Sequence, residues 1–464
     1  MSAQRVSEIA KHACLRCKDR KRKCDKALPS CSLCERLRQA CKYDNRPISP
    51  VRNSQAPENA FSPHHIKDAI VQKLLNFTRE DIVTIYLRTL QPWFAFIPEE
   101  RLSGEFPNTW NDASVDVTLF AFTILLFNAQ PLLLEGSYRL QPDTMLMYLS
   151  IKSWLALLEG AGLNSIGLVY SRLLNTLFEV VHGFHPAAYL SIAATVRAAD
   201  ALSVYDENRV PLLSSLGSIK EREERRDIWC GIMILDRYLA VENGKFPPVT
   251  RGRNIPDYQN QFDRNAEMVS SSFHGSFEAS CLLDKVHIAI YEPTLEQSFN
   301  IEEITMILGA LSSLQTIVAQ DMVGKSRLSS SGLAFATTGL LLIFENGAKP
   351  TIDGRTSQCR EPSIAIMANL LDDILKLLEE LDDSVVFDVQ NFSPFVLHLI
   401  YKAGAIITER LQVGIDLEMN LRKVRIFRKF LKFMSQKWLA GERYLELLNE
   451  DTAPRILKAI ECDG

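Results

Sequence analysis

ACLRCKDRKRKCDKALPSCSLCERLRQACKYD, from Ala13 to Asp44, decides the fold of the first part of this 464-residue chain. The stretch holds six cysteines, which are Cys14, Cys17, Cys24, Cys31, Cys34 and Cys41. Their spacing, C-x2-C-x6-C-x6-C-x2-C-x6-C, consists of two near-copies of C-x2-C-x6-C. Each copy supplies three sulfurs, whereas a tetrahedral zinc ion needs four ligands. Six thiolates therefore satisfy two zinc ions only if two of the sulfurs bridge both metals.

A run of basic residues, KDRKRK at 18–23, lies between the second and third cysteines. Residues 1–50 hold 13 Lys/Arg and 5 Asp/Glu, a net charge of +8, whereas the whole chain carries −4, so the remaining residues carry −12. Metal ligands interleaved with dense positive charge indicate a metal-folded, nucleic-acid-binding module on an acidic body. The alternative interpretation of the run is a solvated basic surface without a specific target.

The context of the cysteines favours metal binding over disulfides. Met1–Lys11 has no apolar segment of the kind found in secretory signals, so reduced cysteines are expected. A segment of about 30 residues buries too little apolar surface to fold alone, so metal binding must supply its folding energy. The longest uncharged stretch, Val117–Leu134, includes Gln130 and Pro131 and is interpreted as a buried helix followed by a turn. No membrane is therefore expected among the partners.

The six cysteines, the basic run, Asp25 after the third cysteine and Pro29 in the connecting loop resemble the fungal Zn2Cys6 binuclear cluster family of transcription regulators. The resemblance covers Ala13–Asp44 and implies two Zn2+ ions, each held by four cysteines, with two thiolates shared. The implied sets are Cys14, Cys17, Cys24 and Cys31 for one ion, and Cys14, Cys31, Cys34 and Cys41 for the other.

The same resemblance implies contacts with double-stranded DNA. Arg20 and Lys21 match the family positions that contact base edges in the major groove. Both residue types donate to guanine N7 and O6, which suits the CGG triplets that the family prefers. Lys18, Lys23 and Lys26 are expected to contact phosphates, which position the module and make binding salt-dependent. The basic run is also typical of nuclear import signals, so the nucleus is the expected location.

Composition divides the chain into a zinc module at 12–44, a flexible linker at 45–65 and a large all-α regulatory domain at 66–464. The linker is rich in Pro, Ser and Asn. In the body, apolar residues recur at helical spacing, for example after the capping-box-like pair Thr78 and Asp81. Helices are predicted near 116–129, 142–160, 164–182, 186–203, 219–241, 276–290, 301–321, 328–346, 363–381, 395–412 and 418–448.

The body also resembles the family's regulatory region, the fungal-specific transcription factor domain or middle homology region. Three stretches carry this resemblance: IYLRTLQPWFAFIPEERL at 85–102, LSIAATVRAADALSVYDE at 190–207 and EREERRDIWCGIMILDRYLAVENGKFPPV at 221–249. The Asp236–Arg237 pair in the third stretch is interpreted as a structural ion pair with helix partners rather than as a catalytic couple.

The partners of the body are less directly indicated. Ile66, Ile70, Leu74 and Phe77 provide little more than one heptad, whereas a stable coiled coil needs about three or four. By family habit, a homodimer formed through the helical body is favoured over a monomer. The body is either a packed scaffold or a domain that binds a small-molecule effector between its helices. The transcription machinery is a further expected partner.

The sequence therefore predicts a nuclear, sequence-specific regulator of RNA polymerase II genes that recognises CGG-type triplets. By analogy, it is a pathway-specific regulator, such as one of a biosynthetic gene cluster. The alternative is a zinc-folded protein–protein interaction factor that no longer binds DNA specifically. An enzyme is not expected and no catalytic residue is assigned, because the sequence has no Gly-rich phosphate loop, H-E-x-x-H or G-x-S-x-G.

Overall fold

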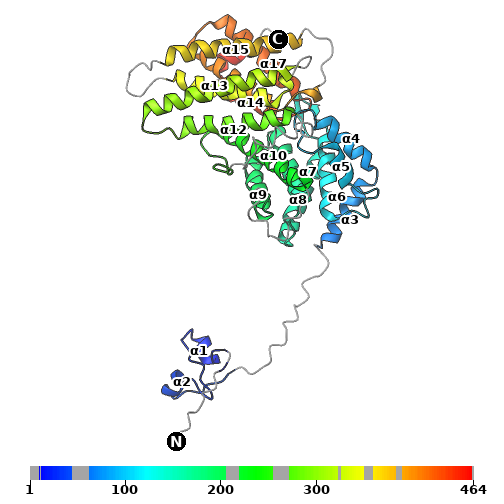
Figure 1. Cartoon of the computed structure of the whole chain (residues 1–464), viewed down its shortest axis with the longest axis vertical. Helices are drawn as coiled ribbons and strands as arrows, with labels where there is room; N and C mark the ends of the chain where they lie inside the picture. The colour runs from blue at the N-terminus through cyan, green and yellow to red at the C-terminus, as the bar shows by residue number, and fades with distance from the viewer. Residues whose placement is uncertain are drawn as a thin grey trace. The chain divides into compact units, whose positions relative to one another are not determined.

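The computed structural model describes residues 10, 12–43, 62–204, 219–253, 271–321, 326–349, 359–382 and 389–461. The chain divides into two compact units, of which the second begins at Pro63 (Figure 1). Most of the predicted linker, up to residue 61, lies outside the described residues, and its last three residues belong to helix α3 (Pro63–Leu74). The predicted fold class, a small cysteine-rich module followed by a large helical body, is confirmed.

The first unit contains two short helices, α1 (Leu15–Asp19) and α2 (Ser32–Arg36). Each of the two helices begins directly after a cysteine, and each has a further cysteine buried within it. The peptide bond between Leu28 and Pro29, in the loop that connects the two halves, is cis.

The first part of the body consists of helices and one short antiparallel hairpin. Its further elements are α4 (Arg79–Thr89), α5 (Glu99–Glu105), α6 (Val115–Leu125), η1 (Leu126–Asn128), β1 (Leu132–Leu134), β2 (Ser137–Arg139), α7 (Pro142–Gly160), α8 (Ile166–Val181) and α9 (Ala187–Ala201). The predicted capping box begins α4: Thr78 N donates to Asp81 Oδ2 at 2.8 Å, and Asp81 N donates to Thr78 Oγ1 at 3.2 Å.

The stretch predicted as a buried helix followed by a turn is largely as expected. Helix α6 and the turn η1 are buried from Thr118 to Phe127. After Pro131, however, the chain forms the hairpin β1–β2 rather than a simple turn, and Leu133 pairs with Tyr138 across it. The three leucines of β1 are exposed, so apolar composition alone did not reveal which part of the stretch is buried.

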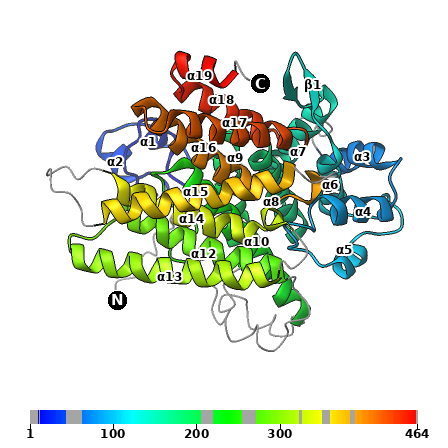
Figure 2. The same cartoon turned by 90° about the horizontal axis from the view of Figure 1, so that it is seen from above.

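The second part of the body is a set of long helices packed side by side (Figures 1 and 2). Its elements are α10 (Ile219–Asn243), α12 (Ser271–Tyr291), α13 (Gln297–Asp321), η4 (Arg327–Ser329), α14 (Ser331–Ala348), α15 (Arg360–Asp382), η5 (Val389–Asn391), α16 (Val396–Val413), α17 (Leu417–Met434), α18 (Ala440–Asp451) and α19 (Pro454–Glu461). Helix α14 lies at the centre of this set, because it packs against α12, α13, α15 and α16.

The single helix predicted near 418–448 is wrong, because the chain breaks between α17 and α18. The break places Trp438 in the core, where only 1% of the side chain is exposed. Its ring meets the ring of Trp93 edge-on, with the centroids 5.6 Å apart. Burial of this large aromatic surface in tertiary contacts outweighs the helical propensity of the segment.

Trp93 also links the two parts of the body into one core. Its ring lies edge-on to that of Phe395, just before α16, at a centroid distance of 5.9 Å. The same Phe395 ring contacts Tyr238 of α10 at 4.9 Å. Segments about 300 residues apart in sequence therefore share one aromatic cluster.

Asp236 and Arg237 were predicted to form a structural ion pair, but among the described residues neither side chain is in an ion pair, and both bind uncharged groups instead. Asp236 Oδ2 accepts a hydrogen bond from Thr250 N at 2.7 Å and so ties the loop after α10 to the helix. Arg237 Nη1 donates to Ser280 Oγ of α12 at 3.2 Å. The two neighbouring residues thus bind separate partners, as structural groups in a helix interface do.

By length and composition, one helix among the described residues could cross a membrane, at Asn300–Gln320 within α13. This segment packs against α12 and α14 through Ile307, Leu311, Leu314 and Val318, which share one face. Its exposed face carries small and polar residues together with the large apolar side chains of Ile301, Met306 and Ile317.

Candidate metal centre and nucleic-acid interface

The first unit brings all six cysteine sulfurs into one cluster. Cys14 Sγ lies 3.8 Å from Cys31 Sγ and 3.7 Å from Cys34 Sγ, and Cys17 Sγ lies 3.8 Å from Cys31 Sγ. Two groups of four have all their sulfurs within 4.8 Å of one another: Cys14, Cys17, Cys24 and Cys31, and Cys14, Cys31, Cys34 and Cys41. Cys14 and Cys31 belong to both groups, and both are fully buried.

The cluster is built from two halves with the same backbone geometry. The two helices begin after Cys14 and Cys31, which are 17 positions apart. The turn after each helix passes through the left-handed region at equivalent positions, with φ 48° at both Lys21 and Arg38. The near-repeat in the sequence is therefore a structural repeat, which explains how each half directs three sulfurs to a common centre.

The half-sites are joined by hydrogen bonds as well as by the cysteines. The Asp25 carboxylate accepts hydrogen bonds from Ser32 N at 3.2 Å and from Ser32 Oγ, so it caps the N-terminus of α2. These hydrogen bonds from Ser32 lower the pKa of Asp25 below its usual value. Asp25 thus attaches the end of the first half to the helix of the second.

Two further contacts in the module were not identified from the sequence. Arg16 Nη1 donates to Gln39 Oε1, and Tyr43 Oη donates to the Ala27 carbonyl oxygen at 2.8 Å. Each contact joins residues more than ten positions apart, and Gln39, Tyr43 and Ala27 lie outside the two helices. Only the position of Tyr43 directly after the last half-site could have suggested that it closes the module.

The protonation chemistry of the sulfur cluster fits two divalent cations. Burial raises the pKa of Cys14 to about 12, and burial also raises the pKa of Cys31. Hydrogen bonds lower the pKa values of Cys24 and Cys41 to about 7 despite their partial burial. Six thiolates packed this closely repel one another, so all six stay deprotonated together only when cations lie among them. Zinc ions supply that charge, bind thiolates in tetrahedral sets of four and contribute the folding energy of so small a unit.

The predicted DNA-contact residues are largely exposed at one end of this cluster. Lys18 lies in α1, and Arg20, Lys21 and Lys23 follow it; the side chains of all four are exposed. Within the described residues these side chains form no ion pair. Lys26 differs from them, because it is half-buried and its carbonyl oxygen accepts a hydrogen bond from Ala10 N at 2.8 Å.

Charge breaks the symmetry between the two halves. Residues 18–23 carry five Lys/Arg and one Asp, whereas the equivalent residues 35–40 carry two Arg and one Glu. Arg20 corresponds to Leu37, and Lys18 corresponds to Glu35. The backbone repeat therefore presents two similar surfaces, of which only the one at the end of α1 is strongly basic.

Comparison with known proteins identifies this module. The family model of the fungal Zn(2)-Cys(6) binuclear cluster domain matches residues 12–48. The depudecin biosynthesis cluster-specific transcription activator DEP6 of Fusarium langsethiae is 58% identical over 46 residues, which are 10% of this chain and 7% of that protein. An uncharacterized transcriptional regulatory protein of Saccharomyces cerevisiae, YLL054C, is 43% identical over 51 residues, which are 11% of this chain and 6% of that protein.

A third relative is matched over a longer stretch. Transcription factor BOA15 of Botryotinia fuckeliana is 27% identical over 141 residues, which are 30% of this chain and 75% of that protein. The chain thus covers less than a tenth of the length of the first two relatives. No solved structure is significantly similar to the chain. The family and the names of the relatives belong to transcription regulation, a non-enzymatic class, as the sequence predicted. Residues 12–48 of this chain are a fungal Zn(2)-Cys(6) binuclear cluster domain, a domain that binds two zinc ions, and the six cysteines of this stretch are clustered in the structure.

Proposed function

We propose that the chain is a nuclear transcription regulator that binds DNA sequence-specifically and recognises CGG-type triplets. The observation that carries the proposal is the exposed basic surface at the end of α1, on a module whose matching surface after α2 lacks it. Relatives named as transcription activators or factors support the same class.

In this proposal the zinc ligands are divided as the sulfur distances suggest. One ion takes the four-cysteine group that includes Cys17 and Cys24, and the other takes the group that includes Cys34 and Cys41. The two thiolates that belong to both groups bridge the ions. The ions hold α1 and α2 in place, so the basic surface keeps a fixed shape.

Arg20 and Lys21 contact base edges in the major groove, and donation to guanine O6 and N7 specifies the GG steps of the triplet. Lys18, Lys23 and Lys26 contact phosphates. These contacts give affinity and register without sequence information, and they make binding weaken with salt. Because Lys26 is half-buried, it contributes less to phosphate binding than the exposed Lys18 and Lys23.

The repeat within the module supplies a matched control for the test. Random duplex DNA is selected with the full-length, zinc-loaded chain and with the variants Lys21→Ala and Arg38→Ala, which alter equivalent backbone positions. We expect enrichment of CGG-type triplets by the wild type and by Arg38→Ala. We expect Lys21→Ala to lose about 1–3 kcal/mol of discrimination. An equal loss of sequence discrimination in the two variants would contradict the proposal that the residues at the end of α1 contact the bases.

The alternative, an interaction factor that no longer binds DNA specifically, is an outcome of the same experiment. A chain that holds two zinc ions but enriches no sequence, and whose binding depends only on salt, would favour it. The spacing of enriched sites also reports on assembly, because two triplets at a fixed distance indicate a dimer.

We further propose that the chain forms a homodimer through its helical body and acts with the transcription machinery in the nucleus. Light scattering of the full-length chain tests the dimer, and a monomer mass at micromolar concentration would contradict it. A fluorescent fusion tests the location, and its matched control replaces Arg20, Lys21 and Arg22 with alanine. Equal cytoplasmic fluorescence from both fusions would exclude a nuclear import signal in the basic run.

A pathway-specific role is proposed from the relatives alone. DEP6 is named as the cluster-specific activator of depudecin biosynthesis, and its similarity to this chain covers 46 residues. By analogy, this chain regulates the genes of one pathway, such as a biosynthetic cluster. Genome-wide mapping of its bound sites tests this, and sites spread over many unrelated pathways would contradict it.

A further inference from the structure

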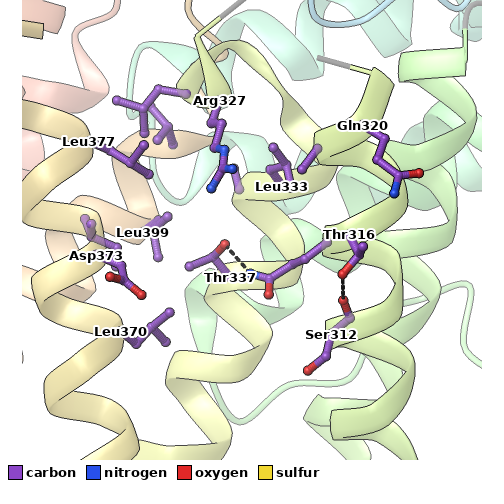
Figure 3. A pocket seen from close by; sticks show the side chains of 16 residues that line it. Ser312, Thr316, Gln320, Arg327, Leu333, Thr337, Leu370, Asp373, Leu377 and Leu399 are labelled. Carbon is purple, nitrogen blue, oxygen red and sulfur yellow. Dashed lines mark hydrogen bonds between the residues drawn. The ribbon is translucent and has the colours of Figure 1, made fainter. Parts of the chain in front are cut away.

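A groove runs along helix α14, between α13 and α15. Two adjoining cavities of about 730 and 500 Å³ form it. Ser312 of α13 and Leu370 of α15 line both cavities, so the two meet at these residues. Figure 3 shows the larger cavity, with side chains from α13 and α15 facing it from opposite sides.

The dimensions of the groove match those of a small-molecule site. Its lining on α13 extends from Thr305 to Gln320, which at about 1.5 Å per residue corresponds to about 22 Å. The larger cavity alone falls within the range of about 300–1,000 Å³ that is typical of ligand pockets. An elongated molecule therefore fits better than a compact one.

The two walls differ in chemistry. The α13 wall is polar but uncharged and carries Ser312, Gln315, Thr316 and Gln320. The facing wall from α15 and α16 is mostly apolar, with Leu370, Ile374, Leu377 and Leu399, and it also carries the carboxylate of Asp373. Gln315 Nε2 donates to Thr337 Oγ1 of α14 at 2.9 Å, and Figure 3 marks this hydrogen bond at Thr337. A ligand in this groove meets hydrogen-bonding groups on one side and aliphatic carbon on the other.

Arg327 of η4 places one cation at the end of the larger cavity. In Figure 3 its side chain points into the cavity near Leu333 and Leu377. Among the described residues, its side chain forms no hydrogen bond or ion pair. The carboxylate in the described lining, Asp373, forms an ion pair with Lys376 at 3.5 Å, and both side chains are mostly exposed. The guanidinium group is therefore available to a ligand.

We propose that this groove binds an amphipathic small molecule with a carboxylate at one end and an apolar chain. The carboxylate pairs with Arg327, whose planar guanidinium suits two parallel hydrogen bonds to carboxylate oxygens. The chain lies along the leucine wall and continues into the smaller cavity. There the apolar lining includes Leu308, Leu340 and Phe344.

The single cation distinguishes this ligand class from others. A nucleotide or nucleic acid would require several cations for its phosphates, and the described lining contains one. An uncharged lipid would gain nothing from Arg327, which is exposed and stays hydrated when no anionic group binds. The proposal does not rest on the DNA-binding function, because its test measures ligand binding and not transcription.

Decanoate and decanol, which share a chain length and differ in the head group, are the probes. Both are titrated calorimetrically into the full-length, zinc-loaded chain. We expect one decanoate per chain and weaker binding of decanol. Arg327→Gln should weaken decanoate binding roughly 10- to 100-fold, the range for a lost charge-assisted hydrogen bond, and leave decanol binding unchanged. Arg139→Gln, which alters an exposed arginine of β2, should change neither.

A second variant tests the position of the ligand. Thr316 is exposed on α13 and lines the cavity, so Thr316→Trp fills the space without disturbing the core. We expect it to abolish binding of both probes while the thermal unfolding temperature stays unchanged. The proposal is overturned by equal affinity for acid and alcohol, by unaltered binding to Thr316→Trp, or by an equal effect of Arg139→Gln. Lack of decanoate binding to the wild type at millimolar concentration overturns it too.

Discussion

Gly441 should be required at the break between α17 and α18, so Gly441→Ala should destabilise the body. A Cβ atom at this position would lie 2.4 Å from the backbone oxygen of Leu431 and 2.6 Å from Ser435 Oγ. The Leu431 oxygen already accepts a hydrogen bond from Ser435 Oγ at 2.8 Å. The end of α17 must therefore move by at least the difference between 2.4 Å and the 3.0 Å that real Cβ contacts need.

The expected magnitude follows from these contacts. Overpacking of a tight interface costs about 1–3 kcal/mol, and the gain in helix propensity at the start of α18 offsets only part of it. The body extends from Pro63 to Gly464. With an unfolding entropy of about 2.1 cal/mol/K per residue over roughly 400 residues, this cost lowers the unfolding temperature by about 1–4 °C.

Gly309→Ala is the matched control. Gly309 lies in the interior of α13, and a Cβ there would meet nothing within 4 Å. Higher helix propensity should then stabilise the protein by about 0.5–1 kcal/mol. Scanning calorimetry of the two variants should show shifts of opposite sign. A Gly441→Ala protein that unfolds at or above the wild-type temperature would refute the reasoning, because it would mean that the end of α17 moves freely.

Two further predictions concern zinc and pH. Cys31→Ser should lower the affinity for both zinc ions, whereas Cys34→Ser should lower it mainly for one. The zinc content that remains after dialysis measures this, and equal losses of zinc in the two variants would contradict the bridging role of Cys31. Burial raises the pKa of Asp227 to about 6, so the folded protein loses stability as pH rises from about 4 to 6, by up to about 3 kcal/mol. Asp227→Asn should therefore unfold at a higher temperature than the wild type above pH 6 and at the same temperature below pH 4. A difference independent of pH would exclude ionisation of Asp227 as the cause.

The metal centre was predictable because its ligands lie close together in the sequence. With intervals of two and six residues, a short helix and the turn after it bring three cysteine sulfurs to one point. The spacing in the sequence was therefore sufficient to predict the arrangement of the sulfurs. The contacts that close the module were not predictable. Arg16 forms a hydrogen bond with Gln39, and Tyr43 forms one with the Ala27 carbonyl oxygen. These residues come together only when the cysteine cluster has formed and has set the path of the turns between them.

The helical body was predictable in class but not in its breaks. Periodic apolar residues identified most helices, because one buried face repeats with the helical period. The helical periodicity of apolar residues also continued across the segment between α17 and α18, where burial of Trp438 ends the helix. Tertiary packing overrides local propensity at such points, and the residues that it buries lie hundreds of positions away.

The sequence by itself determined the chemistry of the first unit: two zinc ions, six sulfurs and a basic surface, because thiolate spacing and charge are local properties. Only the tertiary structure decided that the two halves share one backbone geometry and differ in charge. Only the packing of α13, α14 and α15 brings Arg327 to the end of a groove with a leucine wall. A cavity is the space that several distant segments leave between them, so no single stretch of the chain encodes it.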